Sequence, residues 1–320
     1  MKRRIFLVGG GALVCVGGVQ AQSGRAAHIG FLRWGTPGDD AQAGFGAALG
    51  ALGYREGQNI VIEWRWATSK DVAAKHVAEF VAMGLDLVAA SATPAAHALR
   101  DAKVSMPIVL AGVADPVASG LVASLARPGG NITGVSNNLP AVAGKRVQLL
   151  SETLPKARRI AFLGSKDDPA TSLFVAETHS AARTLNLSVQ VVAISQAQEF
   201  EAAISSMLRE RADAVIVQPL FTLGHSRPLA DILLRLHLPS ISDLRPFAVA
   251  GGLMTYGPSR AETWRRAASF VDRVLKGAKP ADLPIEEPSS FELVVNLKTA
   301  AALGVKIPQS VLLRADEVIQ

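Results

Sequence analysis

Residues 86–116 decide the fold: Asp86-Leu-Val-Ala-Ala-Ser-Ala-Thr-Pro-Ala-Ala-His-Ala-Leu99, followed by Met106-Pro-Ile-Val-Leu-Ala-Gly-Val-Ala-Asp-Pro116. Two short apolar runs, at 85–90 and 108–111, each end at small polar residues and a proline. Runs this short, bounded by residues that interrupt regular structure, predict buried parallel strands rather than helices.

Two helix starts follow these strands. Thr93-Pro94 and Asp115-Pro116 each have the pattern of an N-cap followed by proline at the first helical position. Helix N-termini at the carboxyl ends of neighbouring strands predict a ligand-binding edge, because free N–H groups collect there. Ser91 and Thr93 are therefore candidates to bind a carboxylate, and Asp115 to pair with an ammonium group. Helix capping alone is the alternative for Thr93 and Asp115.

The composition is that of a soluble globular protein, with 49% hydrophobic and 19% charged residues. A chain of 320 residues is long enough for two domains of ordinary size.

The N-terminus has the parts of a secretory signal peptide: a basic start at 2–4, an apolar run over 5–19 and a small-residue end at Ala21. We expect cleavage after Ala21 (residues 1–21) and a periplasmic location, by the Sec or the twin-arginine route. The mature chain then has 30 Lys and Arg against 27 Asp and Glu, and it loses Cys15, the one cysteine. Disulfides and cysteine-based metal sites are thereby excluded, and export excludes nucleic acid as a partner.

Strand patterns alternate with helix patterns along the chain, which predicts βαβ units with parallel sheets. The expected strands are 28–33, 59–66, 85–90, 108–111 and 131–136, then 159–163, 188–194, 213–218 and 239–242. A strand flanked by glycines at 251–258 is interpreted as a return to the first half. A long helix at 260–276, an extended linker at 279–288 and a last strand at 291–297 follow it.

We therefore predict an α/β protein with two Rossmann-like lobes, joined by a hinge of several crossing segments. The expected division is 22–136 plus 254–285 for the first lobe and 137–253 plus 286–320 for the second. A cleft between hinged lobes closes on its ligand.

Several motifs together resemble one family. They are Leu52-Gly-Tyr-Arg-Glu-Gly-Gln-Asn-Ile60, Thr93-Pro-Ala-Ala96, Ala111-Gly-Val-Ala-Asp-Pro-Val117, Ala126-Arg-Pro-Gly-Gly-Asn-Ile-Thr-Gly134, Gly251-Gly-Leu-Met-Thr-Tyr-Gly257, Phe291-Glu-Leu-Val-Val-Asn-Leu-Lys-Thr-Ala300 and Arg314-Ala-Asp-Glu-Val-Ile319. In this order they resemble the exported substrate-binding proteins of ABC transporters, in the group that binds tryptophan or tyrosine.

The resemblance implies a type I periplasmic-binding-protein fold with three crossings between lobes. It also implies capture of a small solute, an amino acid or related carboxylate, for delivery to a membrane permease. The chain departs from the group at Ser165-Lys166, where relatives tend to have Asn-Pro, and at Ser259, where they tend to have Asp. Both departures bear on which ligand is bound.

Further candidate ligand contacts lie in predicted loops and at the expected crossing. Trp34, after the first strand, could form an aromatic wall, whereas Trp264 on the long helix is expected to pack in the core. Tyr256 could reach the ligand or pack against the hinge. The second-lobe candidates are Ser165, Gln218 and Asp243, for each of which a solvated loop residue is the alternative.

No catalytic constellation is visible in the sequence. The six histidines lack metal-ligand spacing, and no Gly-x-Ser-x-Gly motif occurs. We expect a non-enzymatic monomer without metal or cofactor, whose partners are a small-molecule ligand and an ABC permease. The alternative is a periplasmic sensor that reports its ligand to a membrane partner.

Overall fold

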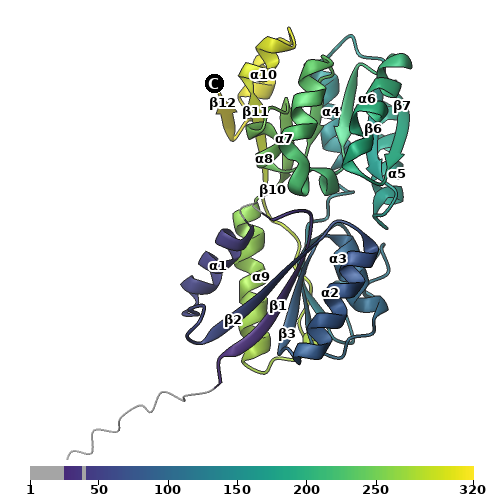
Figure 1. Ribbon diagram of the computed structural model, residues 1–320. Coiled ribbons are helices and arrows are strands. Elements are labelled where there is room, and N and C mark those ends of the chain that lie inside the picture. The colour runs from purple at the N-terminus through teal and green to yellow at the C-terminus, as the bar shows by residue number, and fades with distance from the viewer. Residues whose placement is uncertain (1–24, 38–40) are drawn as a thin grey trace, which may run out of the picture.

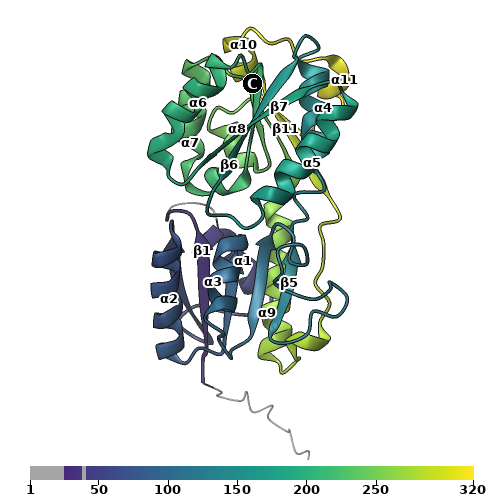
Figure 2. The same ribbon diagram turned by 90° about the vertical axis from the view of Figure 1, so that its right-hand side faces the viewer.

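The computed structural model describes residues 25–37 and 41–320, so the expected signal peptide lies outside the described part of the chain. Two lobes lie end to end, each a twisted sheet covered by helices on both faces (Figures 1 and 2). Among the helices of the described residues, none is both long and apolar enough to cross a bilayer.

The first lobe contains a parallel sheet of five strands in the order β2-β1-β3-β4-β5. The strands are β1 (Ala27–Trp34), β2 (Ile60–Ala67), β3 (Leu87–Ser91), β4 (Ile108–Val113) and β5 (Ile132–Ser136). Helices α2 (Lys70–Met83) and α3 (Thr93–Asp101) cover one face, and α1 (Ala41–Ala51) and α9 (Arg260–Leu275) cover the other.

Side chains of β4 point alternately to the two faces of the sheet, and both faces are covered by helices, so its sequence is an unbroken apolar run. Ile108 and Leu110 pack into the hydrophobic cluster under α2 and α3. Val109 and Ala111 pack into the cluster under α1 and α9. A strand covered on both faces has apolar residues at every position.

The second lobe contains a sheet of seven strands in the order β12-β11-β10-β9-β8-β6-β7, parallel except where β11 runs antiparallel to β10. The strands are β6 (Arg159–Ser165), β7 (Ser188–Ile194), β8 (Ala214–Val217), β9 (Ser240–Ser242), β10 (Met254–Pro258), β11 (Phe291–Asn296) and β12 (Glu317–Ile319). The helices are α4 (Ala143–Thr153), α5 (Thr171–Thr184), α6 (Phe200–Arg209), α7 (Pro219–Arg235), α8 (Arg245–Val249), α10 (Leu297–Ala302) and α11 (Gln309–Leu312).

Three segments cross between the lobes: one after β5, one between β10 and α9, and one from Ile285 to β11. The first and third run side by side, since the Ser136 amide donates to Glu286 O at 2.9 Å and the Glu286 amide to Gly134 O at 3.0 Å.

The strand expected to return to the first lobe does not do so. β10 pairs with β9 and β11 in the second-lobe sheet, so the second crossing comes after Pro258, and the expected boundary at Met254 is wrong for this strand. The buried residues of α9, which include Ala267 and Val271, pack on the first-lobe sheet.

Candidate functional site

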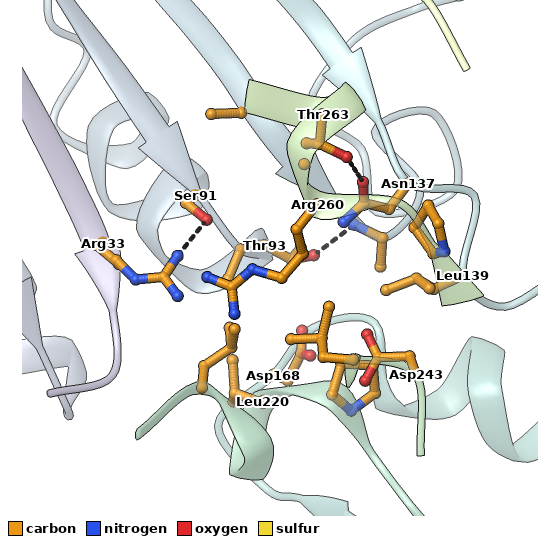
Figure 3. Close-up of a pocket in the computed structure, with 18 of the residues that line it drawn as sticks. Arg33, Ser91, Thr93, Asn137, Leu139, Asp168, Leu220, Asp243, Arg260 and Thr263 are labelled. Carbon is orange, nitrogen blue, oxygen red and sulfur yellow. Dashed lines mark hydrogen bonds between the residues drawn. The ribbon is translucent and has the colours of Figure 1, made fainter. Parts of the chain in front are cut away.

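A cavity lies between the lobes, at the carboxyl ends of β1 and β3 (Figure 3). It holds about 570 Å³ of space free of protein atoms, counting the part that opens to solvent. The first lobe and the crossing segments contribute Arg33, Ser91, Ala92, Thr93, Ala111, Gly112, Ala114, Asn137, Leu139, Pro258, Arg260, Thr263 and Trp264. The second lobe contributes Asp168, Phe174, Pro219, Leu220, Leu223, Asp243 and Leu244.

The N-terminus of α3 forms one wall of the cavity. The residue before the helix, Ala92, has a φ of 75° and a ψ of 152°, and among the described residues no side chain caps the helix there. Thr93 is the first helical residue rather than the N-cap, and its Oγ1 accepts a hydrogen bond from the Ala114 amide at 3.2 Å. Ala92 and Thr93 line the cavity, so the positive end of the helix dipole lies at this wall, an arrangement that suits an anion.

Two arginines add positive charge to the same wall. Arg33, at the end of β1, is buried and donates from Nη1 to Ser91 Oγ at 3.1 Å. The guanidinium carbons of Arg33 and Arg260 lie 5.6 and 5.5 Å from the ring centroid of Trp264. Cation–π contacts with this indole help to hold the two side chains in place. Trp264 lines the cavity and is also buried in the hydrophobic cluster under α1 and α9, where the sequence analysis expected it to pack.

Asp168 faces the arginines from the second lobe (Figure 3). Its Oδ1 accepts from the Ala170 amide at 2.9 Å, and its Oδ2 accepts from Gln218 Nε2 at 2.7 Å. The side-chain oxygen of Gln218, Oε1, accepts hydrogen bonds from the Ser165 amide and the Thr171 hydroxyl. These bonds fix the orientation of the Gln218 side-chain amide. Burial raises the pKa of Asp168 from 3.8 to about 6. Gln218 thus positions a carboxylate that lines the cavity.

Asp243, after β9, is the second carboxylate of the cavity. Its Oδ1 accepts from Ser242 Oγ at 3.1 Å, while its buried Oδ2 has no hydrogen-bond partner among the described residues. Burial raises the pKa of Asp243, and the charges of Arg146 and Arg260 oppose that rise. An unpartnered buried carboxylate oxygen is unfavourable, and a cationic hydrogen-bond donor on a ligand would satisfy it.

Arg146 lies behind this carboxylate, outside the cavity lining. Its side chain is fully buried in α4, and its Nε donates to Tyr256 O at 2.9 Å. Burial lowers the pKa of Arg146, and the negative charge of Asp243 opposes this effect. The buried cation therefore favours the ionised form of Asp243.

Three of the eight residues predicted from the sequence line this cavity: Ser91, Thr93 and Asp243. Gln218 lies behind the wall and contacts Asp168. Asp115 accepts hydrogen bonds from the Val117 and Ala118 amides instead of facing the cavity. The helix expected after Asp115 is wrong, because residues 116–120 form turns.

The remaining predicted residues also lie elsewhere. Trp34 is the last residue of β1 rather than part of a loop, and it packs in the hydrophobic cluster of the first lobe. Trp34 and Ser165 line a separate, more polar hollow between the lobes. The Tyr256 ring stacks on Phe291 of the neighbouring strand β11 at 5.9 Å between centroids and is not among the residues that line the cavity.

Sequence reasoning missed Arg33, Asn137, Asp168, Arg260 and Trp264. Arg33 ends a predicted strand at the expected ligand edge, so its position was a usable signal. Arg260 and Trp264 lie in the first turns of α9, and only the placement of β10 shows that this helix starts beside the cavity.

The family comparison bears directly on this arrangement of two lobes and a charged cavity. Residues 36–319 match the family model described as ABC transporter substrate binding protein. The chain belongs to this family. The family consists of substrate-binding proteins rather than enzymes, and membership confirms the non-enzymatic role expected from the sequence.

Individual relatives of this substrate-binding protein agree with the assignment. The tyrosine-binding protein of Clostridioides difficile (strain R20291) is 30% identical over 274 residues, 84% of this chain and 77% of the relative. An ABC domain from Streptococcus pneumoniae in complex with L-Trp has a TM-score of 0.85 and 30% identity, with 92% of this chain and 100% of that chain covered.

A more distant neighbour shows the same fold. A glucose-galactose binding protein from Geobacillus stearothermophilus has a TM-score of 0.61 at 15% identity, with 85% of this chain and 98% of that chain covered. The fold is therefore that of the type I periplasmic binding proteins, as the sequence predicted.

Proposed function

We propose that this substrate-binding protein is exported and captures an aromatic α-amino acid in the interlobe cavity, for delivery to an ABC permease. The observation that carries the proposal is the distribution of charge across the cavity. Arg33, Arg260 and the α3 N-terminus lie on one side, and Asp168 and Asp243 lie on the other.

This distribution complements a zwitterion. An α-carboxylate would accept from Ser91 Oγ, the guanidinium groups and the first-turn amides of α3. The α-ammonium group would donate to Asp168 and to the unpartnered Oδ2 of Asp243. The lining contains two cationic and two anionic side chains, so a ligand with no net charge leaves the cavity electrostatically balanced.

Apolar lining residues support a large apolar side chain on the ligand. Phe174, Leu139, Leu220 and Leu244 line the same space, and an aromatic group buries much apolar area against such walls. The tyrosine-binding relative and the relative solved with L-Trp agree with this choice.

Calorimetric titration of the mature protein tests the proposal. L-Trp, L-Tyr and L-Phe are compared with tryptamine, which lacks the carboxylate, and indole-3-propionate, which lacks the ammonium group. We expect at least one amino acid to bind, and we expect each matched analogue to bind about ten- to hundredfold more weakly, since a charge-assisted hydrogen bond is lost. Equal binding of L-Trp and indole-3-propionate would contradict the proposed contact between the ligand's ammonium group and Asp168 and Asp243.

A further inference from the structure

The two lobes also touch through a pair of glycines, Gly35 after β1 and Gly224 inside α7. A Cβ on Gly35 would lie 1.8 Å from the carbonyl oxygen of Leu223. A Cβ on Gly224 would lie 2.6 Å from Thr36 Oγ1 and 2.8 Å from the Thr36 amide nitrogen. Each glycine thus admits the backbone of the other lobe into the space that a side chain would fill.

The sequence of α7 explains why a carbonyl is available at this contact. Leu223, Gly224 and His225 have non-helical backbone angles, and Pro228 follows four residues after Gly224. Proline has no N–H to donate to the carbonyl four residues earlier, and its ring would clash with that carbonyl in a regular helix. The Gly224 carbonyl instead accepts a hydrogen bond from Thr36 Oγ1 of the first lobe at 3.3 Å.

Apolar packing accompanies the glycine contact. Leu220, Leu223 and Leu244 belong to the second lobe, yet they pack in the same buried cluster as Leu32 and Trp34 of the first. Contact between the lobes therefore removes apolar surface from water in addition to forming a hydrogen bond.

All these contacts exist only while the lobes are together. Ser91 and Asp243 are only 4% and 3% exposed, so a ligand enters the cavity when the lobes separate. Separation breaks the Thr36–Gly224 hydrogen bond and exposes the leucines. This contact therefore stabilises the closed form relative to the open form, whichever ligand is bound.

We propose that Gly35 and Gly224 form a latch that sets ligand affinity by stabilising the closed arrangement, so that the lobes are partly closed before ligand binds. Apparent affinity is the intrinsic affinity scaled by the fraction of protein in the binding-competent form. The latch rests on closure around a ligand, as in the proposed function, but it does not depend on which ligand is bound.

The experiment compares wild type with Gly35→Ala and Gly224→Ala. Gly277→Ala is the matched control, because Gly277 also has a positive φ, of 96°, but no described atom lies within 4 Å of where its Cβ would be. Thr36→Val is a milder variant that removes the hydrogen bond and keeps the side-chain shape. Circular dichroism confirms that each variant is folded.

Small-angle X-ray scattering of the ligand-free proteins gives the first result. We expect Gly35→Ala and Gly224→Ala to have a larger radius of gyration than wild type and Gly277→Ala, because the new Cβ atoms meet backbone that can move away only if the lobes separate. We expect Thr36→Val to have an intermediate radius of gyration. If a glycine variant fails to fold, the comparison of Thr36→Val with wild type tests the latch. Identical scattering from all variants would overturn the latch.

Titration with the amino acids gives the second result. We expect the latch variants to lose affinity for every ligand by the same factor, about tenfold if the closed population falls tenfold, with the ratio between ligands unchanged. A changed ratio would show that the glycines act on ligand recognition and would contradict the latch. Because scattering needs no ligand, a failure of the proposed function is distinguishable from a failure of the latch.

Discussion

At the scale of single residues, Asp168 and Asp243 have different roles because their partners differ. Both oxygens of Asp168 accept hydrogen bonds from the protein, whereas Asp243 has one buried oxygen without a partner among the described residues. Asp168 is therefore well oriented without ligand, and Asp243 gains most when a cationic donor arrives.

The pH dependence of stability tests the state of Asp168. Burial raises its pKa from 3.8 to about 6, so the folded protein binds this proton more tightly than the unfolded chain does. The contribution of Asp168 to the free energy of unfolding is greatest below pH 4 and declines by about 3 kcal/mol as the pH rises to 6. Asp168→Asn lacks this decline.

Urea unfolding between pH 4 and 7 measures the effect. We expect the difference in unfolding free energy between Asp168→Asn and wild type to shift in favour of the variant as the pH rises. A difference that stays constant over this range would show that the carboxyl is not perturbed in the folded protein.

Asp243→Asn tests the ammonium contact. The substitution keeps the shape of the side chain and removes its negative charge, so we expect affinity for the bound amino acid to fall about tenfold or more. Binding of the deaminated analogue, which has no ammonium group and carries a net negative charge, should not weaken. Asp167→Asn is the control, since Asp167 lies in the neighbouring loop outside this cavity. Titration calorimetry measures the affinity of each variant. An equal loss of affinity in Asp243→Asn and Asp167→Asn would contradict the proposed contact between Asp243 and the ammonium group.

At the scale of helices and strands, the sequence predicted the elements that have a regular apolar pattern. It did not predict the features that depend on contacts between distant segments. Apolar runs such as 108–111 located the parallel strands, because full burial leaves the same signature at each. The turn after Asp115 was predicted as a helix, because Asp-Pro is equally compatible with capping a turn. The position of β10 depends on its pairing with β9 and β11, which its own residues do not encode.

The candidate site shows the same division. Ser91 and Thr93 follow from the strand-to-helix transition itself, and Asp243 from the end of a predicted strand. Arg260 and Trp264 could not be placed, because their approach to the cavity depends on where α9 starts after the second crossing. Asp168 could not be placed either, because its orientation depends on a hydrogen bond from Gln218, fifty residues later in the chain.

The start of α3 makes a prediction about strain. Ala92, with φ 75° and ψ 152°, occupies a region that glycine adopts readily and that costs other residues about 1–3 kcal/mol. Ala92→Gly should therefore raise the free energy of unfolding by about 1 kcal/mol, after the added flexibility of the unfolded chain is subtracted. Ala98→Gly, within α3, should lower it by about 1 kcal/mol. Denaturant unfolding measures both, and destabilisation by Ala92→Gly would contradict the strain.

At the scale of the whole molecule, the two lobes contribute complementary halves of one site. The first lobe provides Arg33, Arg260 and the α3 N-terminus, and the second provides both carboxylates. In the closed arrangement these charges lie on opposite sides of one cavity, where the proposed zwitterionic ligand would pair with both. Neither lobe alone provides both the cationic and the anionic groups, so the proposed recognition of an amino acid requires the closed arrangement.

A crystal structure of the mature protein with L-Trp or L-Tyr tests this account most directly. We expect the amino acid between the lobes, with its carboxylate at Ser91 and the start of α3 and its ammonium group within hydrogen-bond distance of Asp243 Oδ2. An amino acid bound outside this cavity, or bound there with its ammonium group toward Arg33 and its carboxylate toward Asp243, would contradict it.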